Sequence, residues 1–209
     1  MKNRDVYLQS IHAAYPDLDV VSVEYNAQGQ NSDVVVVNRG FIFRFPKYTH
    51  VLENQKTETT ILQALRGWLP LPVPDPIYAN LENPLGQAFA GYRLIPGEPL
   101  WRDTFRAIED REVVRGLADQ VAGFLRALHG MPPAELGVEL ALHDTYEESA
   151  GIYARIREKL FGFMRPDARD WATRHFERFL SDAGNFQHLP VLKHGDFGTS
   201  NIPVSYTHL

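Results

Sequence analysis

The residues best suited to chemistry lie near the end of the chain, in the run HGDFGTSN at residues 194–201. Within this run Asp196 stands five residues before Asn201, so both side chains belong to one loop. Phosphoryl transfer requires a carboxylate that orients a hydroxyl nucleophile and accepts its proton, together with an oxygen ligand for Mg²⁺. The residue types and their spacing therefore predict a kinase catalytic loop in which Asp196 is the catalytic base and Asn201 binds the metal.

Other interpretations of this loop stay open at the level of sequence. Asp and Asn are also ordinary turn-forming residues. The tripeptide Asp-Phe-Gly at residues 196–198 also spells the metal-binding motif of protein kinases. No second His-x-Asp loop with an Asn at the right distance lies upstream, so we interpret Asp196 as the base. We expect His194 to support the loop through hydrogen bonds rather than to accept the proton.

The catalytic loop resembles that of the aminoglycoside phosphotransferase family, which also includes macrolide, choline and related small-molecule kinases. Residues 41–47, FIFRFPK, resemble the third strand of that family, where a basic residue reaches the nucleotide phosphates. The resemblance gives this role to Arg44 and makes Glu58, in the helix that follows, its ion-pair partner. Lys is the commoner residue at this position, and Arg can grip phosphate oxygens bidentately where Lys acts as a point charge.

Two further segments carry the resemblance. Residues 69–74 and 89–100 are similar to the lobe connector and hinge of the 2''-aminoglycoside kinases. The resemblance implies that the nucleobase binds the main-chain carbonyl of Arg93 and the main-chain amide of Ile95. The loop at residues 28–33 lies where the family's phosphate-covering loop lies, and it adds Ser32 as a candidate nucleotide contact. That loop has one glycine and no nucleotide fingerprint, so a plain turn remains an alternative.

The resemblance covers about residues 20–202 and then fails. The family continues from the catalytic loop into a strand, a turn and a second Asp that ligates Mg²⁺, whereas this chain continues with PVSYTHL at residues 203–209. Pro203 is poorly suited to a central strand. We therefore expect a truncated or frame-disrupted reading that lacks the metal-binding Asp and catalyses inefficiently.

Two lobes of an α+β, protein-kinase-like fold are expected to position these residues. Residues 1–95 would form a nucleotide-binding lobe with an antiparallel sheet and one or two helices, and residues 96–209 a mainly helical, incomplete lobe that holds the catalytic loop. Apolar and β-branched runs between polar turns predict strands at residues 20–24, 33–38, 40–45, 77–80 and 89–95. Asn38 and Gly40 would supply the positive φ angles of a tight hairpin.

Helical periodicity places the remaining elements. The first residues are expected to form a leading helix, and a proline-rich connector follows the next helix at residues 69–76. Gly130 is expected to stop one of the later helices, and Pro166 to separate the last two. Helices are predicted at residues 52–68, 110–129, 146–163 and 168–180.

Composition excludes several other classes of protein. The chain has 209 residues, 44% of them hydrophobic, no cysteine and a net charge of −5. Its apolar runs are far shorter than the roughly 20 residues that span a bilayer, and no signal peptide is recognisable, so no membrane association and a cytoplasmic location are expected. Scattered Lys and Arg argue against nucleic-acid binding. The histidines show no paired spacing that suggests zinc.

The leading hypothesis is transfer of the γ-phosphate of ATP or GTP, with Mg²⁺, to a hydroxyl of a small molecule, with an aminoglycoside as the preferred acceptor. The alternatives are a macrolide or other metabolite kinase of the same fold, and a catalytically incompetent nucleotide-binding fragment. A protein kinase is disfavoured because the hinge resembles that of small-molecule kinases, and no activation-loop or Ala-Pro-Glu signature is present. The sequence indicates no oligomeric state.

Overall fold

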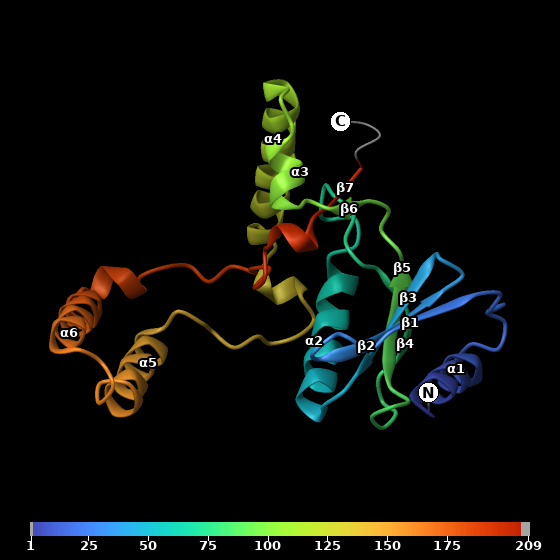
Figure 1. Ribbon diagram of the computed structural model, residues 1–209, viewed down its shortest axis with the longest axis horizontal. Helices are drawn as coiled ribbons and strands as arrows, with labels where there is room; N and C mark the ends of the chain where they lie inside the picture. Colours follow the sequence, from blue (N-terminus) through green and yellow to red (C-terminus); the bar gives the residue numbers. More distant parts are fainter. Residues whose placement is uncertain (1, 206–209) are drawn as a thin grey trace. The chain divides into compact units, whose positions relative to one another are not determined.

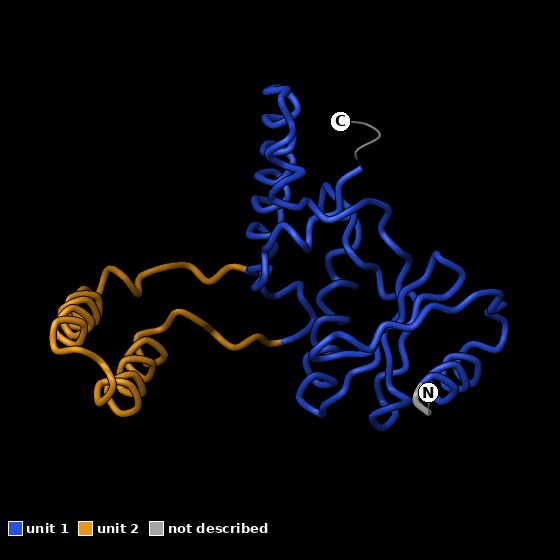
Figure 2. Tube along the Cα trace, in the orientation of Figure 1, with its two compact units in different colours: residues 1–138, 192–209 blue, residues 139–191 orange. Residues whose placement is uncertain are grey.

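The computed structural model describes residues 2–205 in two compact units. Unit 1 holds the described residues up to Val138 together with those from Leu192 onward, and unit 2 is Glu139–Val191 (Figure 2). The predicted boundary after residue 95, which separates the expected nucleotide-binding lobe from the expected helical lobe, differs from the boundaries of these compact units, and it stays a prediction. Within the described part of the chain, no helix is both long enough and apolar enough to cross a bilayer.

Unit 1 contains a five-stranded antiparallel sheet with the strand order β1-β2-β3-β5-β4. This confirms the predicted α+β class and the antiparallel sheet. Each predicted strand is present, with ends that shift by a few residues. The strands are β1 (Val23–Asn26), β2 (Ser32–Val37), β3 (Phe41–Pro46), β4 (Pro76–Asn80) and β5 (Phe89–Arg93) (Figure 1).

The hairpin between β2 and β3 corrects the prediction about its turn. Asn38 and Arg39 have φ angles of 54° and 52°, and Gly40 is not in the left-handed region. Two consecutive positive φ angles define a type I′ turn, whose twist matches that of the flanking strands. The Asn38 side chain accepts hydrogen bonds from the amides of Val21, at 2.8 Å, and Ser22, at 3.0 Å. Because the Asn38 side chain occupies these amides, β1 begins at Val23 rather than at Val20.

One face of the sheet forms the main core with helix α1 (Lys2–Ala14). Side chains alternate between the two faces of a strand, so every second apolar residue of β2 and β3 points to this face. The ring of Tyr7 on α1 stacks on Phe45 with centroids 4.1 Å apart. The buried members of the core are Tyr7, Ile11, Val35, Val37, Phe43, Phe45 and Phe89.

Helix α2 (Thr49–Ala64) lies on the other side of the sheet from α1 (Figure 1). It begins three residues before the predicted start and ends at Ala64, ahead of the predicted end at Trp68. Gln55, which is buried, donates from Nε2 to the main-chain oxygen of Arg44 at 3.1 Å. The side chains of β3 that do not enter the main core therefore face α2.

The rest of unit 1 is built from short elements around one long helix. Asp110 caps α4 by accepting from the amide of Glu112 at 2.8 Å. Gly130 ends α4 where predicted, but with a right-handed φ of −82° rather than a left-handed one. The elements are β6 (Glu98–Pro99), α3 (Arg102–Arg106), α4 (Arg111–His129), η1 (Pro133–Glu135), η3 (Thr199–Asn201) and β7 (Pro203–Val204).

Pro203 lies in a strand that the sequence did not predict. Strand β7 pairs only with β6, with Glu98 opposite Val204 and Pro99 opposite Pro203. A proline lacks the amide donor of a ladder, and a ribbon this short needs few such donors. The amide of Leu100 also donates to the main-chain oxygen of Ile202 at 3.0 Å, so the segment after the catalytic loop is tied to the segment after β5.

Unit 2 is a pair of helices, α5 (Tyr146–Lys159) and α6 (Pro166–Ser181), followed by η2 (Ala183–Phe186). The rings of Tyr153 and Phe176 stack between the helices with centroids 4.8 Å apart. Pro166 begins α6 instead of standing between helices, because the first position of a helix does not use its amide proton.

Gly91 of β5 allows a close approach that alanine would prevent. A Cβ atom there would lie 2.6 Å from Cδ1 of the buried Phe43 ring. We expect Gly91→Ala to lower the free energy of unfolding by about 1–3 kcal/mol, as overpacking does. Gly116→Ala in α4 meets nothing within 4 Å, and it is expected to raise stability by up to about 1 kcal/mol. Urea unfolding measures both, and a Gly91→Ala variant as stable as the wild type would contradict the expectation.

Candidate active site

The catalytic loop holds Asp196 and Asn201 against each other. Gly195 enters the loop with a φ of 80°, and the amide of Gly198 donates to the main-chain oxygen of Asp196 at 2.9 Å. The amide of Asn201 then donates to the main-chain oxygen of Gly198 at 2.9 Å. These two turns reverse the chain within a few residues, and they bring a carboxylate and a carboxamide that are five positions apart into contact.

The contact between these two side chains leaves defined atoms for chemistry. Asn201 donates from Nδ2 to Oδ2 of Asp196 at 3.0 Å and to its main-chain oxygen at 2.9 Å. The carboxamide nitrogen is therefore used within the loop, and Oδ1 of Asn201 is the atom suited to a hard cation. Oδ1 of Asp196 is suited to accept a hydroxyl proton. Asp196 itself is exposed, as a base that must meet a substrate requires.

The oxygen atoms of this loop fit a Mg²⁺ ion that is bound partly by protein and partly by phosphate and water, rather than one enclosed by protein ligands alone. Mg²⁺ prefers six oxygen ligands and commonly takes several from water and phosphates, with one or two from protein. Within residues 2–205, no group of three or more His, Asp or Glu side chains could hold a metal. Asn201 with phosphate oxygens and water matches this mode of binding.

An aromatic contact anchors the loop to α4. The ring of Phe197 stacks on Phe124 with centroids 5.9 Å apart, and His194 packs edge-on against Phe197 at 5.3 Å. Phe124 is buried on α4. His194 thus contacts the loop through its ring, next to the residue that fixes the loop to the helix, and its expected support through hydrogen bonds stays a prediction.

Arg44 and Glu58 form an ion pair between β3 and α2. The Arg44 Nη1 atom lies 3.1 Å from Oε1 and 3.3 Å from Oε2 of Glu58. Their side chains are 32% and 44% exposed, so the pair is partly shielded from solvent and remains open to a ligand. A carboxylate in this position orients the guanidinium before any anion arrives. The geometry can therefore present a fixed cation to phosphate oxygens.

Tyr92 is a member of this cluster that the sequence did not indicate. Tyr92 on β5 pairs with Ile42, two residues before Arg44 on β3, so both side chains point to the same face. Burial lowers the pKa of Arg44, but the charge of Glu58 and the Tyr92 hydroxyl raise it above its ordinary value overall. The pKa of Tyr92 is also raised overall: burial is the largest cause, the charge of Glu58 adds to it, and Arg44 acts in the opposite direction. Only the strand register, not the motif, could have revealed Tyr92.

Ser32 is buried at the start of β2, and its Oγ atom has no hydrogen-bond partner. A buried hydroxyl without a partner costs about 1–3 kcal/mol, so such an atom is a candidate ligand contact. The preceding loop approaches closely: a Cβ atom on Gly29 would lie 2.4 Å from the main-chain oxygen of Ser32. The single glycine of this loop is therefore required by space, although its sequence lacks a nucleotide fingerprint.

The predicted nucleobase contacts lie at the end of β5, beyond the last residue of β5 that pairs with β4. The amide of Leu94 donates to the main-chain oxygen of Gly40 at 2.9 Å, which extends the pairing with β3. Neighbouring residues of an extended chain direct their main-chain groups to opposite edges. The Arg93 carbonyl and the Ile95 amide would then point away from β3, beyond the Pro76 end of β4. The Arg93 side chain lies over the Phe41 ring at 5.3 Å.

The structure thus brings together two pairs, Arg44 with Glu58 and Asp196 with Asn201. Within residues 2–205, no hydrogen bond or ion pair that the structure shows joins one pair to the other. Unit 1 holds both pairs.

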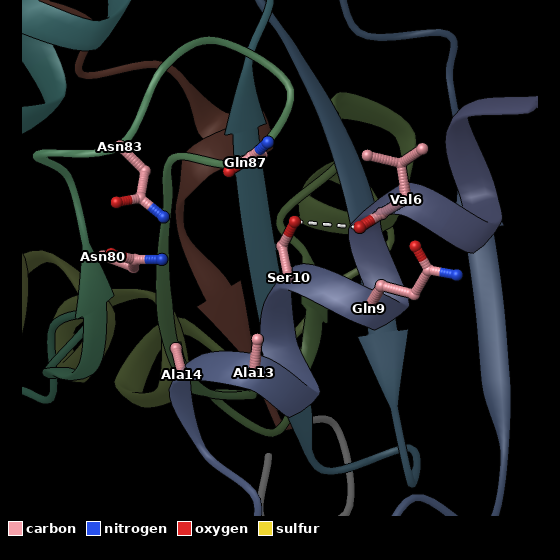
Figure 3. Close-up of a pocket in the computed structure, with 8 residues that line it drawn as sticks. All are labelled: Val6, Gln9, Ser10, Ala13, Ala14, Asn80, Asn83 and Gln87. Atoms are coloured by element: carbon pink, nitrogen blue, oxygen red, sulfur yellow. Dashed lines mark hydrogen bonds between the residues drawn. The ribbon is translucent and has the colours of Figure 1, made fainter.

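A separate pocket lies on the α1 side of the sheet (Figure 3). It has a volume of about 420 Å³ and none of the predicted site residues lines it. Its walls carry amide and small side chains without charge, which do not match an anionic triphosphate. The lining residues are Val6, Gln9, Ser10, Ala13, Ala14, Asn80, Asn83 and Gln87.

The sequence model of the APH phosphotransferase enzyme family matches residues 22–209. This match includes β1 to β5 and the catalytic loop, and the chain therefore belongs to this family of enzymes. A comparison with curated proteins found no match.

Solved structures share the fold. The GDP and kanamycin complex of APH(2'')-IIIa has a TM-score of 0.82 and 24% identity, and the match covers 96% of this chain and 67% of that one. The streptomycin-ATP-APH(2'')-IIa complex has a TM-score of 0.76 and 20% identity, covering 95% and 66%. Macrolide 2'-phosphotransferase MphH from Brachybacterium faecium has a TM-score of 0.67 and 21% identity, covering 95% and 68%. The chain spans about two thirds of the length of each of these proteins.

The ion pair of Arg44 and Glu58 is expected to show measurable coupling. In a double-mutant cycle of Arg44→Met and Glu58→Gln, we expect a coupling free energy of about 0.5–1 kcal/mol, because both side chains are partly exposed to solvent. Urea unfolding measures it. The cycle of Arg66→Met and Asp75→Asn is the control, since that pair is more exposed, at 50% and 49%, and should couple more weakly. Absence of coupling between Arg44 and Glu58 would contradict the pairing.

Proposed function

We propose that the chain is the nucleotide-binding and catalytic-loop part of a small-molecule kinase, which transfers the γ-phosphate of ATP or GTP to a hydroxyl group. The observation that carries the proposal is the hydrogen bond from Asn201 to the Asp196 carboxylate, since it joins a base and a metal ligand on one loop. Membership of the phosphotransferase family supports it. In this proposal residues 1–95 bind the nucleotide, and residues 96–209 supply the catalytic loop.

Each site residue has a distinct role in the proposal. Arg44, oriented by Glu58, binds phosphate oxygens, and the Ser32 hydroxyl donates to the phosphates from the covering loop. The main-chain carbonyl of Arg93 and amide of Ile95 bind the base. Mg²⁺, when bound, neutralises charge on the phosphates. Asp196 then orients the acceptor hydroxyl and accepts its proton, while Asn201 keeps the carboxylate in place and provides an oxygen to the metal.

An aminoglycoside is the acceptor that we propose first, and a macrolide second. The solved structures with the same fold include complexes of kinases with kanamycin, streptomycin and gentamicin, and macrolide 2'-phosphotransferases. The net charge of −5 also favours a cationic acceptor. Phosphorylation of such compounds would make this an antibiotic-resistance enzyme.

Nucleotide binding is the first test of the proposal. A ligand that binds only the folded chain stabilises it by about 2.7 kcal/mol at a hundredfold excess over the dissociation constant. We expect Mg-ATP or Mg-GTP to raise the melting temperature of the wild type. Arg44→Ala should reduce this shift, whereas Arg66→Ala, another cation of unit 1, should retain it. No shift with either nucleotide would contradict the proposal.

Phosphate transfer tests the role of Asp196. With kanamycin as the acceptor, we expect Asp196→Asn to bind nucleotide as the wild type does and to lose transfer by at least about a hundredfold, as loss of a general base does. Asp75→Asn is the matched control, because Asp75 is an exposed carboxylate distant from Asp196 in the sequence, and this variant should retain transfer. Transfer by Asp196→Asn at the wild-type rate would rule out its role as the base. Nucleotide binding without turnover by the wild type would indicate a binding protein instead.

A further inference from the structure

Lys47 forms the most shielded ion pair that the structure shows among the described residues. Its Nζ atom lies 3.0 Å from Oδ1 of Asp33, and the two side chains are 26% and 6% exposed. Lys47 directly follows β3, and Asp33 is the second residue of β2. A buried carboxylate is costly unless it is paired and hydrogen-bonded, so this pair depends on both partners.

Lys47 also binds the loop that precedes β2. Its ammonium group donates to the main-chain oxygens of Ala27, at 3.1 Å, and Gly29. Its main-chain amide donates to the oxygen of Asn31 at 2.9 Å. One residue therefore holds three carbonyl groups of the segment between β1 and β2.

Asp33 is held from its other side by two tyrosines. Its Oδ2 atom accepts from the hydroxyl of Tyr7, at 2.8 Å, and from the hydroxyl of Tyr25, at 3.1 Å. Burial, together with the hydrogen bond and charge of Asp33, raises the pKa of Tyr25. Tyr7 stacks on Phe45 in the main core. The carboxylate is thereby fixed to α1 and to β1, and it offers Lys47 an ion-pair partner in a fixed position.

The ammonium group of Lys47 is engaged by three groups. It donates hydrogen bonds to the main-chain oxygens of Ala27 and Gly29, and its charge is paired with Oδ1 of Asp33. The charge of Lys47 is therefore directed to Asp33 and the loop in this arrangement, although Lys47 lies three residues after Arg44 on the same strand and its extension. Its contacts determine the path of the loop instead.

We propose that Lys47 is a positioning residue: with Asp33 it holds the segment at residues 27–31 in the conformation that covers the nucleotide phosphates. The inference rests on the proposed function, because it gives this segment a phosphate to cover. It also explains how a loop with one glycine can be preorganised without a glycine-rich fingerprint. The ion pair and the carbonyl contacts fix the conformation of the loop, which glycine backbone conformations fix in such fingerprints. Gly29 allows the close approach of the loop to Ser32.

The test uses the full chain and compares wild type, Lys47→Met and a control, Lys56→Met. Lys56 bridges Glu53 and Glu82 at 3.4 Å and 3.5 Å, so its loss also removes ion pairs, but these pairs involve no residue of the loop. Hydrogen exchange of the amides at residues 27–31 is measured without nucleotide. Dissociation constants are measured for ATP and adenosine, or for GTP and guanosine if the wild type prefers guanine.

We expect Lys47→Met to exchange the loop amides at least about tenfold faster and to bind the triphosphate about tenfold more weakly, which corresponds to about 1.4 kcal/mol. Nucleoside affinity should stay unchanged, because the loop covers phosphates and not the base. Lys56→Met should behave as the wild type in all three measurements. A residue with only a structural role would lower the melting temperature without separating the triphosphate from the nucleoside.

A second variant keeps the test decisive if Lys47→Met leaves Asp33 unpaired and does not fold. Asp33→Asn combined with Lys47→Met removes both charges, and so avoids a lone buried carboxylate. The same faster exchange and weaker triphosphate binding are expected of it.

The outcomes separate this inference from the proposed function. If the wild type binds the triphosphate and the folded variants match it in loop exchange and affinity, the positioning role is wrong and the proposed function stands. Weaker triphosphate binding with unchanged loop exchange would also overturn it, since Lys47 would then contact phosphate directly. If the wild type binds no nucleotide, the proposed function is wrong and the inference fails with it.

Discussion

Strand β3 has a neighbour on each edge, so its side chains can go only to the two faces of the sheet. Phe43 and Phe45 enter the main core and are fully buried, and Arg44 between them faces α2. A slip of one residue in the register would exchange the faces of all three. The burial of two aromatic rings therefore fixes the side on which the cation meets Glu58, and the proposed phosphate site depends on the packing of the opposite face.

The catalytic loop is held in another way, because it is not part of the five-stranded sheet. Its own turns join Asp196 to Asn201, and Phe197 attaches it to Phe124 of α4. The chain after it pairs with the segment after β5 through the short β6–β7 ribbon. A Cβ atom on Gly97, which has a φ of 133°, would lie 3.0 Å from the main-chain oxygen of Val204. Local hydrogen bonds shape this part of the site, and a few nonlocal contacts anchor it.

Buried polar groups fall into two kinds in the sheet region. Oδ2 of Asp33 accepts from two tyrosine hydroxyls, and Oδ1, which has no hydrogen bond, is paired by charge with Lys47, so Asp33 joins α1, β1 and the loop before β2. The Ser32 hydroxyl next to it has no partner. A buried carboxylate that is held by a cation and two hydroxyl donors stabilises one arrangement of the backbone, whereas a hydroxyl with neither an ion-pair nor a hydrogen-bond partner keeps its bonding capacity for a ligand. The neighbouring residues Ser32 and Asp33 thus separate ligand contact from support.

The sequence by itself determined the five strands of the main sheet, the five longer helices, the placing of Asp196 and Asn201 on one loop and, through family resemblance, the candidate partnership of Arg44 with Glu58. These features rest on local periodicity, turn chemistry and motif spacing, which a linear pattern preserves. Tertiary structure alone decided that Arg39, and not Gly40, shares the left-handed turn with Asn38, that Tyr92 joins Arg44, and that Lys47 binds Asp33 and the loop carbonyls. Each of these depends on strand register and on which face a side chain takes, and register is set by packing between segments distant in the chain.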